Sequence, residues 1–219
     1  MEINKLLTTV NFKKGNGKQN KYIVLHFVGA TGGAQANCKY FQSNYRGASA
    51  HYFVGHLGEV WQCVLDTDIS WHCGASTYKH AYCRNENSIG IELCCKKKSD
   101  GTWYFEDATV KSAIELTKQL MKKYNIPVAN VIRHYDVTGK SCPEPYVRDN
   151  AAWNEFKKKL IEEEKPVIKL DNTPDAYAED AVNWAIKNGI LKGTEAGDFK
   201  LHSPVTRQEM LVFLYRALR

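Results

Sequence analysis

The chain has 219 residues, 43% of them hydrophobic, and a formal net charge of +6 at pH 7. This length predicts one large domain or a medium domain with a small one, and the apolar share is enough for a packed core. The chain is too long for a small disulfide scaffold, and its seven cysteines are an odd number that full pairing cannot use. No stretch approaches the ~18 consecutive apolar residues of a membrane span, so we expect no membrane insertion.

The positive charge is confined to the N-terminal part. From Pro166 onward basic and acidic side chains are equal in number, so residues 1–165 carry the whole excess. A basic surface favours an anionic partner, although simple solubility explains it equally well.

The first twenty residues, MEINKLLTTVNFKKGNGKQN, contain no apolar run long enough for a signal peptide. We therefore expect the protein to be made in the cytoplasm with reduced thiols. If it acts outside the cell, another route must release it.

Four stretches in the first part of the chain predict β-strands. They span residues 22–30, 49–64, 88–95 and 131–137. The second stretch holds two runs around HLGE, which predicts a hairpin. In the fourth, VIRHYDV, we expect the strand to end at His134 and to continue as a loop.

Apolar residues at helical spacing predict a helix over 105–126, stopped by Pro127, and a second over 146–164. Strands interleaved with helices indicate an α/β domain. We expect residues 1–161 to form a central mixed β-sheet flanked by helices.

The last quarter of the chain has a different character. Residues 162–174 are charged and punctuated by proline, which predicts a linker. Residues 175–219 show two helical patterns, the first capped by Gly189 and the second opened by Thr206 or Ser203. This predicts a small all-α helix–loop–helix module, near the lower size limit for independent folding.

The stretch IRHYDVTGKSCPEP, from Ile132 to Pro145, raises the question of a metal site. A catalytic zinc site has three ligands drawn from His, Cys and carboxylate side chains, and imidazole and thiolate suit zinc. His26, in an apolar strand, His134 and Cys142 are such side chains. A lone histidine in a strand is more often packed than ligating. On these residues alone, a metal site, a thiol nucleophile and an ordinary loop all stay open.

Five motifs, in this order, carry a resemblance to a known family: IVLHFVGA, SAHYFVG, ISWHCGAS, NSIGIELC and IRHYDVTGKSCP. Over roughly residues 20–160 the chain resembles the zinc-dependent N-acetylmuramoyl-L-alanine amidases of the phage T7 lysozyme-like class, which includes the peptidoglycan recognition proteins. The resemblance implies a zinc ion (Zn²⁺) bound by His26, His134 and Cys142.

The resemblance also implies catalytic roles for Glu92 and Lys140. Members without the glutamate use a tyrosine at the position of Ala50, so this chain depends on Glu92 as the base. A partly buried carboxylate has a raised pKa, which suits proton transfer from zinc-activated water. Lys140 can stabilise the developing oxyanion. The alternatives are an ion pair between Glu92 and a lysine of CKKKS, and a solvated charge at Lys140.

Trp71 and His72, in ISWHCGAS, are expected to bind substrate beside the metal. Asp136 or backbone carbonyls are expected to orient His134. A cysteine peptidase using Cys142 is disfavoured, because two prolines follow this cysteine and no helix start is expected after it.

Residues 175–219 resemble a single S-layer homology repeat through AVNWAIKNGILKG, GDFKLHSPVTRQE and the closing apolar helix. The resemblance implies that Thr206, Arg207 and Glu209 bind a secondary cell-wall polymer. Ordinary capping of the helix start is the alternative. Such repeats usually occur in threes, so a single repeat either binds weakly or self-associates.

Together the resemblances imply a peptidoglycan hydrolase that cleaves the amide bond between N-acetylmuramic acid and L-alanine. We expect a phage or prophage endolysin that a holin releases onto a Gram-positive wall, with peptidoglycan rather than nucleic acid as its partner. A host autolysin and a non-catalytic peptidoglycan-binding protein are the alternatives. The presence of both Cys142 and Glu92 counts against the non-catalytic protein.

Overall fold

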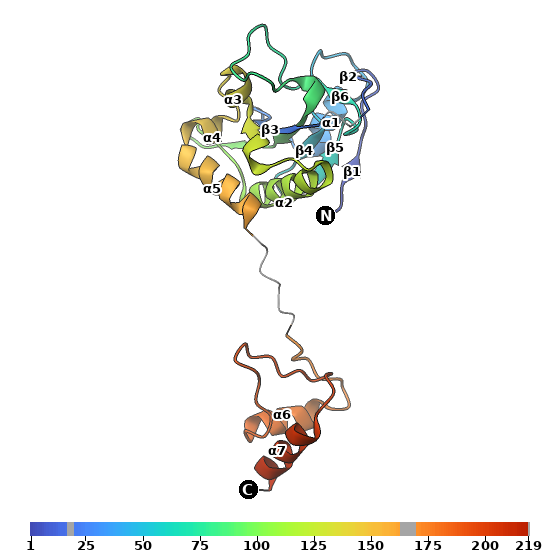
Figure 1. Ribbon diagram of the computed structural model, residues 1–219, viewed down its shortest axis with the longest axis vertical. Helices are drawn as coiled ribbons and strands as arrows, with labels where there is room; N and C mark the ends of the chain where they lie inside the picture. Colours follow the sequence, from blue (N-terminus) through green and yellow to red (C-terminus); the bar gives the residue numbers. More distant parts are fainter. Residues whose placement is uncertain (17–19, 163–169, 219) are drawn as a thin grey trace. The chain divides into compact units, whose positions relative to one another are not determined.

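The computed structural model describes residues 1–16, 20–162 and 170–218. The chain forms two compact units, Met1–Glu162 and Glu163–Arg219 (Figure 1). Most of the predicted linker 162–174 lies outside the described residues, and its bounds stay a prediction. No helix among the described residues is both long and apolar enough to cross a membrane.

A six-stranded sheet forms the centre of the first unit, in the order β1-β5-β4-β7-β3-β10. The strands are β1 (Asn4–Lys5), β3 (Tyr22–Phe27), β4 (Tyr52–Val54), β5 (Val60–Gln62), β7 (Ser88–Leu93) and β10 (Val131–Arg133). Neighbouring strands are parallel except β4 and β5, which are antiparallel. The mixed sheet and the hairpin at HLGE are confirmed.

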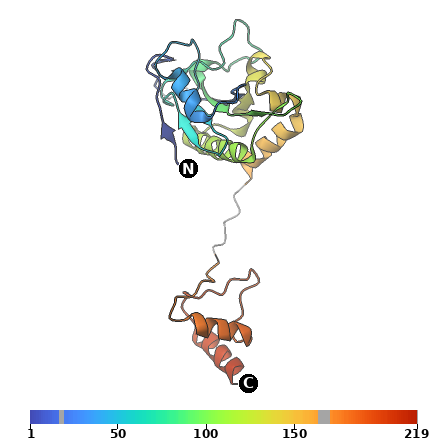
Figure 2. The ribbon, with the colours of Figure 1, turned by 180° about the vertical axis from the view of Figure 1, so that it is seen from behind.

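Two long helices cover one face of this sheet, α2 (Asp107–Tyr124) and α5 (Asn150–Ile161). Their apolar sides pack on alternate residues of the strands, such as Ile23, Leu25 and Ile91. Helix α1 (Ala34–Gln42) packs on the other face against Phe53, and the view from behind brings it forward (Figure 2). Because side chains alternate along a strand, residues such as His26 point away from α2.

The expectation for VIRHYDV is wrong beyond Arg133. Strand β10 ends there, and His134 opens the short helix α3 (His134–Thr138) rather than a loop. The carboxylate of Asp136 accepts a hydrogen bond from the Arg133 backbone N–H at 2.9 Å and so supports the helix start. Gly139, with φ +86°, ends the helix in the left-handed conformation.

The predicted helix over 146–164 is two helices, α4 (Glu144–Arg148) and α5. A helix therefore does start shortly after Cys142, contrary to the expectation. Several short elements were not predicted from the sequence. They are β2 (Phe12–Lys13), β6 (Ile69–Ser70), β8 (Lys96–Lys97), β9 (Trp103–Tyr104) and the 3-10 turns Asn85–Asn87 and Val128–Asn130.

The second unit contains α6 (Glu179–Lys187) and α7 (Arg207–Ala217), joined by a loop. Gly189 follows α6 with φ +69°, and Thr206 caps α7 by accepting a hydrogen bond from the Glu209 backbone N–H. Both features match the sequence prediction of a helix–loop–helix.

A buried carboxylate ties the β4–β5 hairpin to the end of α2. Asp66 accepts hydrogen bonds from the hydroxyls of Tyr52 and Tyr124, and from Lys123 Nζ at 2.8 Å. Burial opposes ionisation, but the bonds from Lys123 and the two tyrosines prevail and lower the pKa of Asp66. The carboxylate is thus more stable in the folded protein than in the unfolded chain.

We expect Asp66→Asn to lower the free energy of unfolding by about 1.5–3 kcal/mol at pH 7, because it weakens bonds to a buried charge. Since folding lowers this pKa, the contribution is present above the ordinary value of 3.8 and is lost as the pH falls through the folded value. Urea unfolding at pH 7 and at pH 3 measures both effects. The exposed Asp100→Asn is the control, and equal losses for the two variants would contradict the assignment.

Candidate metal centre

His26 and Glu92 lie side by side on the sheet face that points away from α2. They are directly paired across β3 and β7, and Glu92 also pairs with Phe53 of β4. This register is what brings an imidazole and a carboxylate together from residues far apart in the sequence.

His134 and Cys142 reach the same place from the end of β10. After Gly139 turns the chain, the Cys142 carbonyl accepts a hydrogen bond from the Tyr135 backbone N–H at 2.8 Å. Cys142 Sγ lies 3.7 Å from His26 Nδ1. One donor atom from each of His26, His134 and Cys142 lies within 4.8 Å of the other two.

Burial keeps both histidines neutral. It lowers the pKa of His26 well below its usual value, with further lowering from His72, His134 and Lys140. Burial, followed by the charge of Lys140, lowers the pKa of His134 to about 4. Neutral imidazoles are the form that binds a metal ion.

Its surroundings hold the Cys142 thiol in its protonated form. Burial and then the charge of Glu92 raise its pKa to about 12. A protonated thiol is a weak nucleophile, so the start of α4 at Glu144 does not turn this cysteine into a peptidase nucleophile. A bound metal ion would instead deprotonate it outright.

Two buried polar atoms at the site lack a hydrogen-bond partner among the described residues, His134 Nδ1 and Glu92 Oε2. Buried polar atoms in folded proteins are nearly always paired, so these two point to a missing group. Catalytic zinc is bound by three protein ligands drawn from histidine, cysteine and carboxylate side chains, with a fourth position open. The side chains present therefore fit a zinc ion.

Glu92 is poised for proton transfer. Burial raises its pKa to about 7, against the lowering effect of Lys140. The alternative of an ion pair with CKKKS finds no support, because each of these lysines has another partner. Lys96 bonds to Glu106, Lys97 lies over the Trp103 ring and Lys98 over the Tyr104 ring.

The expected role of Asp136 is wrong. Its carboxylate binds the guanidinium of Arg133 at 2.9 Å and also caps α3, and it makes no bond with His134. The Arg133 guanidinium is the stronger partner for a carboxylate, since the pair can bind through two parallel hydrogen bonds.

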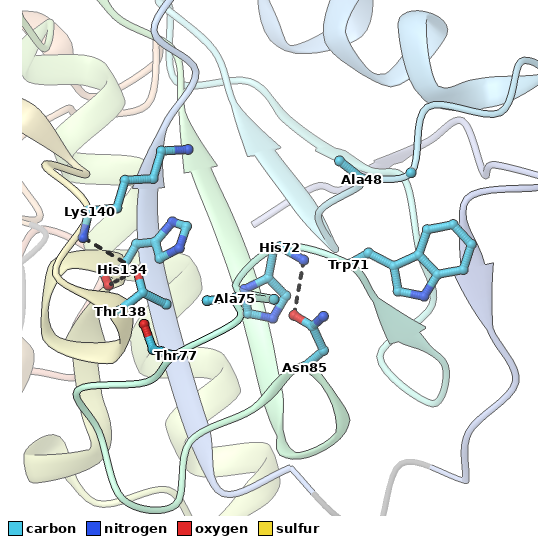
Figure 3. Close-up of a pocket in the computed structure, with 11 residues that line it drawn as sticks. Ala48, Trp71, His72, Ala75, Thr77, Asn85, His134, Thr138 and Lys140 are labelled. Atoms are coloured by element: carbon cyan, nitrogen blue, oxygen red, sulfur yellow. Dashed lines mark hydrogen bonds between the residues drawn. The ribbon is translucent and has the colours of Figure 1, made fainter.

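Two neighbouring cavities, of about 350 and about 700 Å³, meet at the site. The smaller contains the three candidate ligands and Glu92, and both are lined by Trp71, His72, His134 and Lys140. Figure 3 shows Lys140 and His134 on one side of the larger cavity, Trp71 on the other and His72 between them. A substrate in this cleft would contact the predicted residues Trp71 and His72.

The candidate residues of the second unit form a helix cap. Glu209 Oε2 accepts hydrogen bonds from the Thr206 backbone N–H and hydroxyl, both at 2.8 Å. Thr206 and Arg207 border an apolar cavity of about 370 Å³ with Met210 and Leu211. The capping alternative is thus present in the structure, and polymer binding by these residues stays a prediction.

Sequence reasoning missed Asn85 and Ser88. The Asn85 side chain accepts a hydrogen bond from the His72 backbone N–H (Figure 3). It accepts another from the Cys73 backbone N–H. Ser88 lies 3.1 Å from the His72 ring. The only sequence signal for Ser88 was its place as the polar first residue of the apolar run SIGIELCC.

Comparison with known proteins gives two family matches. Residues 16–145 match the N-acetylmuramoyl-L-alanine amidase family, and residues 170–211 match the S-layer homology domain.

Two relatives come from Bacillus licheniformis. A probable N-acetylmuramoyl-L-alanine amidase is 35% identical over 151 residues, which are 64% of this chain and 41% of the relative. The amidase CwlL is 34% identical over 152 residues, 64% of this chain and 40% of CwlL. The chain thus spans about two fifths of the length of these relatives.

Two solved structures have the same fold as the first unit. The structure of PlyL superposes with a TM-score of 0.63 at 25% identity, covering 75% of this chain and 100% of PlyL. The catalytic domain of XlyA superposes with a TM-score of 0.59 at 26% identity, covering 73% of this chain and 99% of that domain.

Proposed function

The chain belongs to the N-acetylmuramoyl-L-alanine amidase family, and we propose that it hydrolyses the amide bond between N-acetylmuramic acid and L-alanine in peptidoglycan. One observation carries this proposal. The donor atoms of His26, His134 and Cys142 converge within 4.8 Å, in a cavity with a Glu92 oxygen that has no hydrogen-bond partner among the described residues. The amidase names of the matched relatives support the same substrate.

Zinc, held by His26, His134 and Cys142, would polarise the scissile carbonyl and lower the pKa of water to about 7. Glu92 takes a proton from the attacking water and returns it to the leaving amine, for which its pKa of about 7 is well matched. Lys140, which lines both cavities, places a positive charge where the carbonyl oxygen becomes negative.

For the second unit we propose binding to a secondary cell-wall polymer, in keeping with its S-layer homology match. The module would hold the enzyme on its insoluble substrate. Self-association of the module would compensate for the presence of a single repeat.

The biological setting we propose is a phage or prophage endolysin, made in the cytoplasm and released by a holin onto a Gram-positive wall. The likeness of the first unit to a mutant endolysin from Bacillus subtilis, with a TM-score of 0.59 at 28% identity, supports an enzyme of this type. A host autolysin is the second candidate.

Mass spectrometry of digested peptidoglycan, run beside a metal assay, tests the proposed reaction. We expect stem peptides with a free L-alanine amino terminus, glycan strands of unchanged length, and zinc bound to the protein. New reducing sugar ends, or cuts within the stem peptide, would contradict the proposal.

Deletion of residues 166–219 is expected to weaken binding to whole walls by about tenfold or more, because a second attachment site raises effective concentration. Hydrolysis of soluble fragments should be unchanged, since every candidate catalytic residue lies in the first unit. Co-sedimentation with walls and turnover of soluble fragments measure the two effects. Unchanged sedimentation would leave the second unit without its proposed role.

A further inference from the structure

A chain of buried hydrogen bonds leads from the backbone of Arg84 to the candidate ligand His26. The Ser88 hydroxyl donates to the Arg84 carbonyl at 2.6 Å and lies 3.1 Å from His72 Nε2. His72 Nδ1 lies 3.0 Å from His26 Nε2. The exposed fractions of Ser88, His72 and His26 are 1%, 9% and 1%, and burial of this kind strengthens hydrogen bonds.

The direction of each bond follows from the proton count. A serine hydroxyl has one proton, and here it goes to a carbonyl that can only accept. Ser88 Oγ must then accept from His72, which places a proton on His72 Nε2. A neutral imidazole protonated at Nε2 has a bare Nδ1, so His72 Nδ1 accepts the proton of His26 Nε2.

The same proton count also determines the protonation state of the other ring nitrogen of His26, Nδ1. With its proton on Nε2, neutral His26 carries a lone pair on Nδ1. That atom is the one that lies 3.7 Å from Cys142 Sγ, on the side of the candidate metal site. The chain of bonds thus ends on a nitrogen that is free to ligate.

We infer that His72 and Ser88 are positioning residues that fix His26 in the tautomer whose Nδ1 faces the metal. This inference rests on the proposed zinc function and gives His72 a second role besides lining the cleft. Partners that orient a ligating histidine raise its basicity and fix its ring, and their loss typically costs about 10–100-fold in metal affinity.

The packing around His72 supports a fixed ring. A Cβ at Gly90 would lie 2.5 Å from His72 Cγ and 2.8 Å from its Nδ1, so only glycine lets the ring lie against β7. Asn85 Oδ1 accepts the backbone N–H of His72 at 3.1 Å and so fixes the main chain that carries the ring. Gly90 thus leaves room for the ring against β7, and Asn85 anchors its backbone.

The tautomers can be read directly by NMR on the metal-free full chain labelled with ¹⁵N-histidine. Long-range proton–nitrogen spectra at neutral pH should show His26 and His72 protonated at Nε2 and bare at Nδ1. In Ser88→Ala, His72 loses its acceptor, and we expect a mixture of tautomers at both rings. A wild-type His26 protonated at Nδ1 would overturn the inference, even if Ser88→Ala fails to fold.

Zinc affinity is the second readout, measured by competition with a chromogenic chelator. We expect Ser88→Ala to lower affinity by about 10–100-fold. Ser70→Ala is the matched control, because buried Ser70 Oγ lies 2.8 Å from Nδ1 of another buried histidine, His51, outside this chain of bonds. Its affinity should stay within about twofold of wild type.

Wild-type affinity in folded Ser88→Ala, or an equal loss in Ser70→Ala, would overturn the inference. Neither readout involves peptidoglycan, so the proposed function can fail separately. If the wild-type protein shows the expected tautomers and binds zinc tightly but does not hydrolyse peptidoglycan, the proposed function is contradicted. The positioning role of His72 and Ser88 would still stand.

Discussion

Glu92→Gln is expected to lower the turnover of purified peptidoglycan by about 10²–10⁴-fold while leaving zinc affinity nearly unchanged. Glutamine has almost the same shape but cannot take a proton from water. Glu92 is not one of the three converging donors, so the metal should stay bound. Release of free amino termini measures turnover, and the chelator competition described for Ser88→Ala measures affinity.

The size of this effect depends on the surroundings of Glu92. Its oxygen Oε2 is buried with no hydrogen-bond partner among the described residues, and burial raises its pKa to about 7. Such a group exchanges protons readily near neutral pH, which an ion-paired surface carboxylate does not.

Glu106→Gln is the matched control, since Glu106 binds Lys96 and lines neither cavity of the cleft. It should retain turnover within about twofold, as surface changes away from a site usually do. Near-normal turnover of Glu92→Gln would mean that another group in the cleft acts as the base. An equal loss of turnover in both variants would indicate that reduced protein stability, and not the loss of a base, causes the effect.

The sequence predicted the positions of the strands better than their pairing and register in the sheet. Apolar runs of strand length are a local signal, and the strands at 22–27 and 88–93 lie inside the predicted runs. That His26 pairs with Glu92 depends on register, which arises from packing of the whole sheet. Helix α1 was missed because it is short and its two buried residues, Ala34 and Cys38, are small, which leaves only a weak helical apolar pattern.

The candidate ligands came from the order of five motifs and not from spacing. His134 was expected at the end of a strand, whereas it opens a helix of five residues that is too short to show periodicity. The bonds among Ser88, His72 and His26 join residues 16 and 46 positions apart. Contacts of this kind depend on the tertiary fold, and no local rule predicts them.

The charge states at the site limit the cost of its burial. Neutral histidines and a protonated thiol avoid the larger cost of burying charges, and a carboxylate with a pKa of about 7 is half neutral at that pH. The fold can therefore form the cleft before a cation arrives. A bound metal ion would then favour the thiolate of Cys142, which the pKa of about 12 otherwise prevents.

Removal of the metal is expected to abolish the release of free amino termini from purified walls, and added zinc should restore it. Cys142→Ser should lower zinc affinity by more than the about 10–100-fold expected for an outer partner, because it removes a thiolate from the ligand set. Dialysis against a chelator, re-addition of zinc and the competition assay measure these effects.

Cys38→Ser is the matched control for Cys142→Ser. It makes the same change at a buried thiol, but Cys38 packs in α1 beside Ala50 and Phe53 and belongs to no donor group. We expect its zinc affinity to equal that of the wild type even if its stability falls. Activity that survives exhaustive metal removal would exclude the zinc mechanism. Unchanged affinity in Cys142→Ser would exclude the thiolate as a ligand, because the remaining two imidazoles would then account for all of the binding.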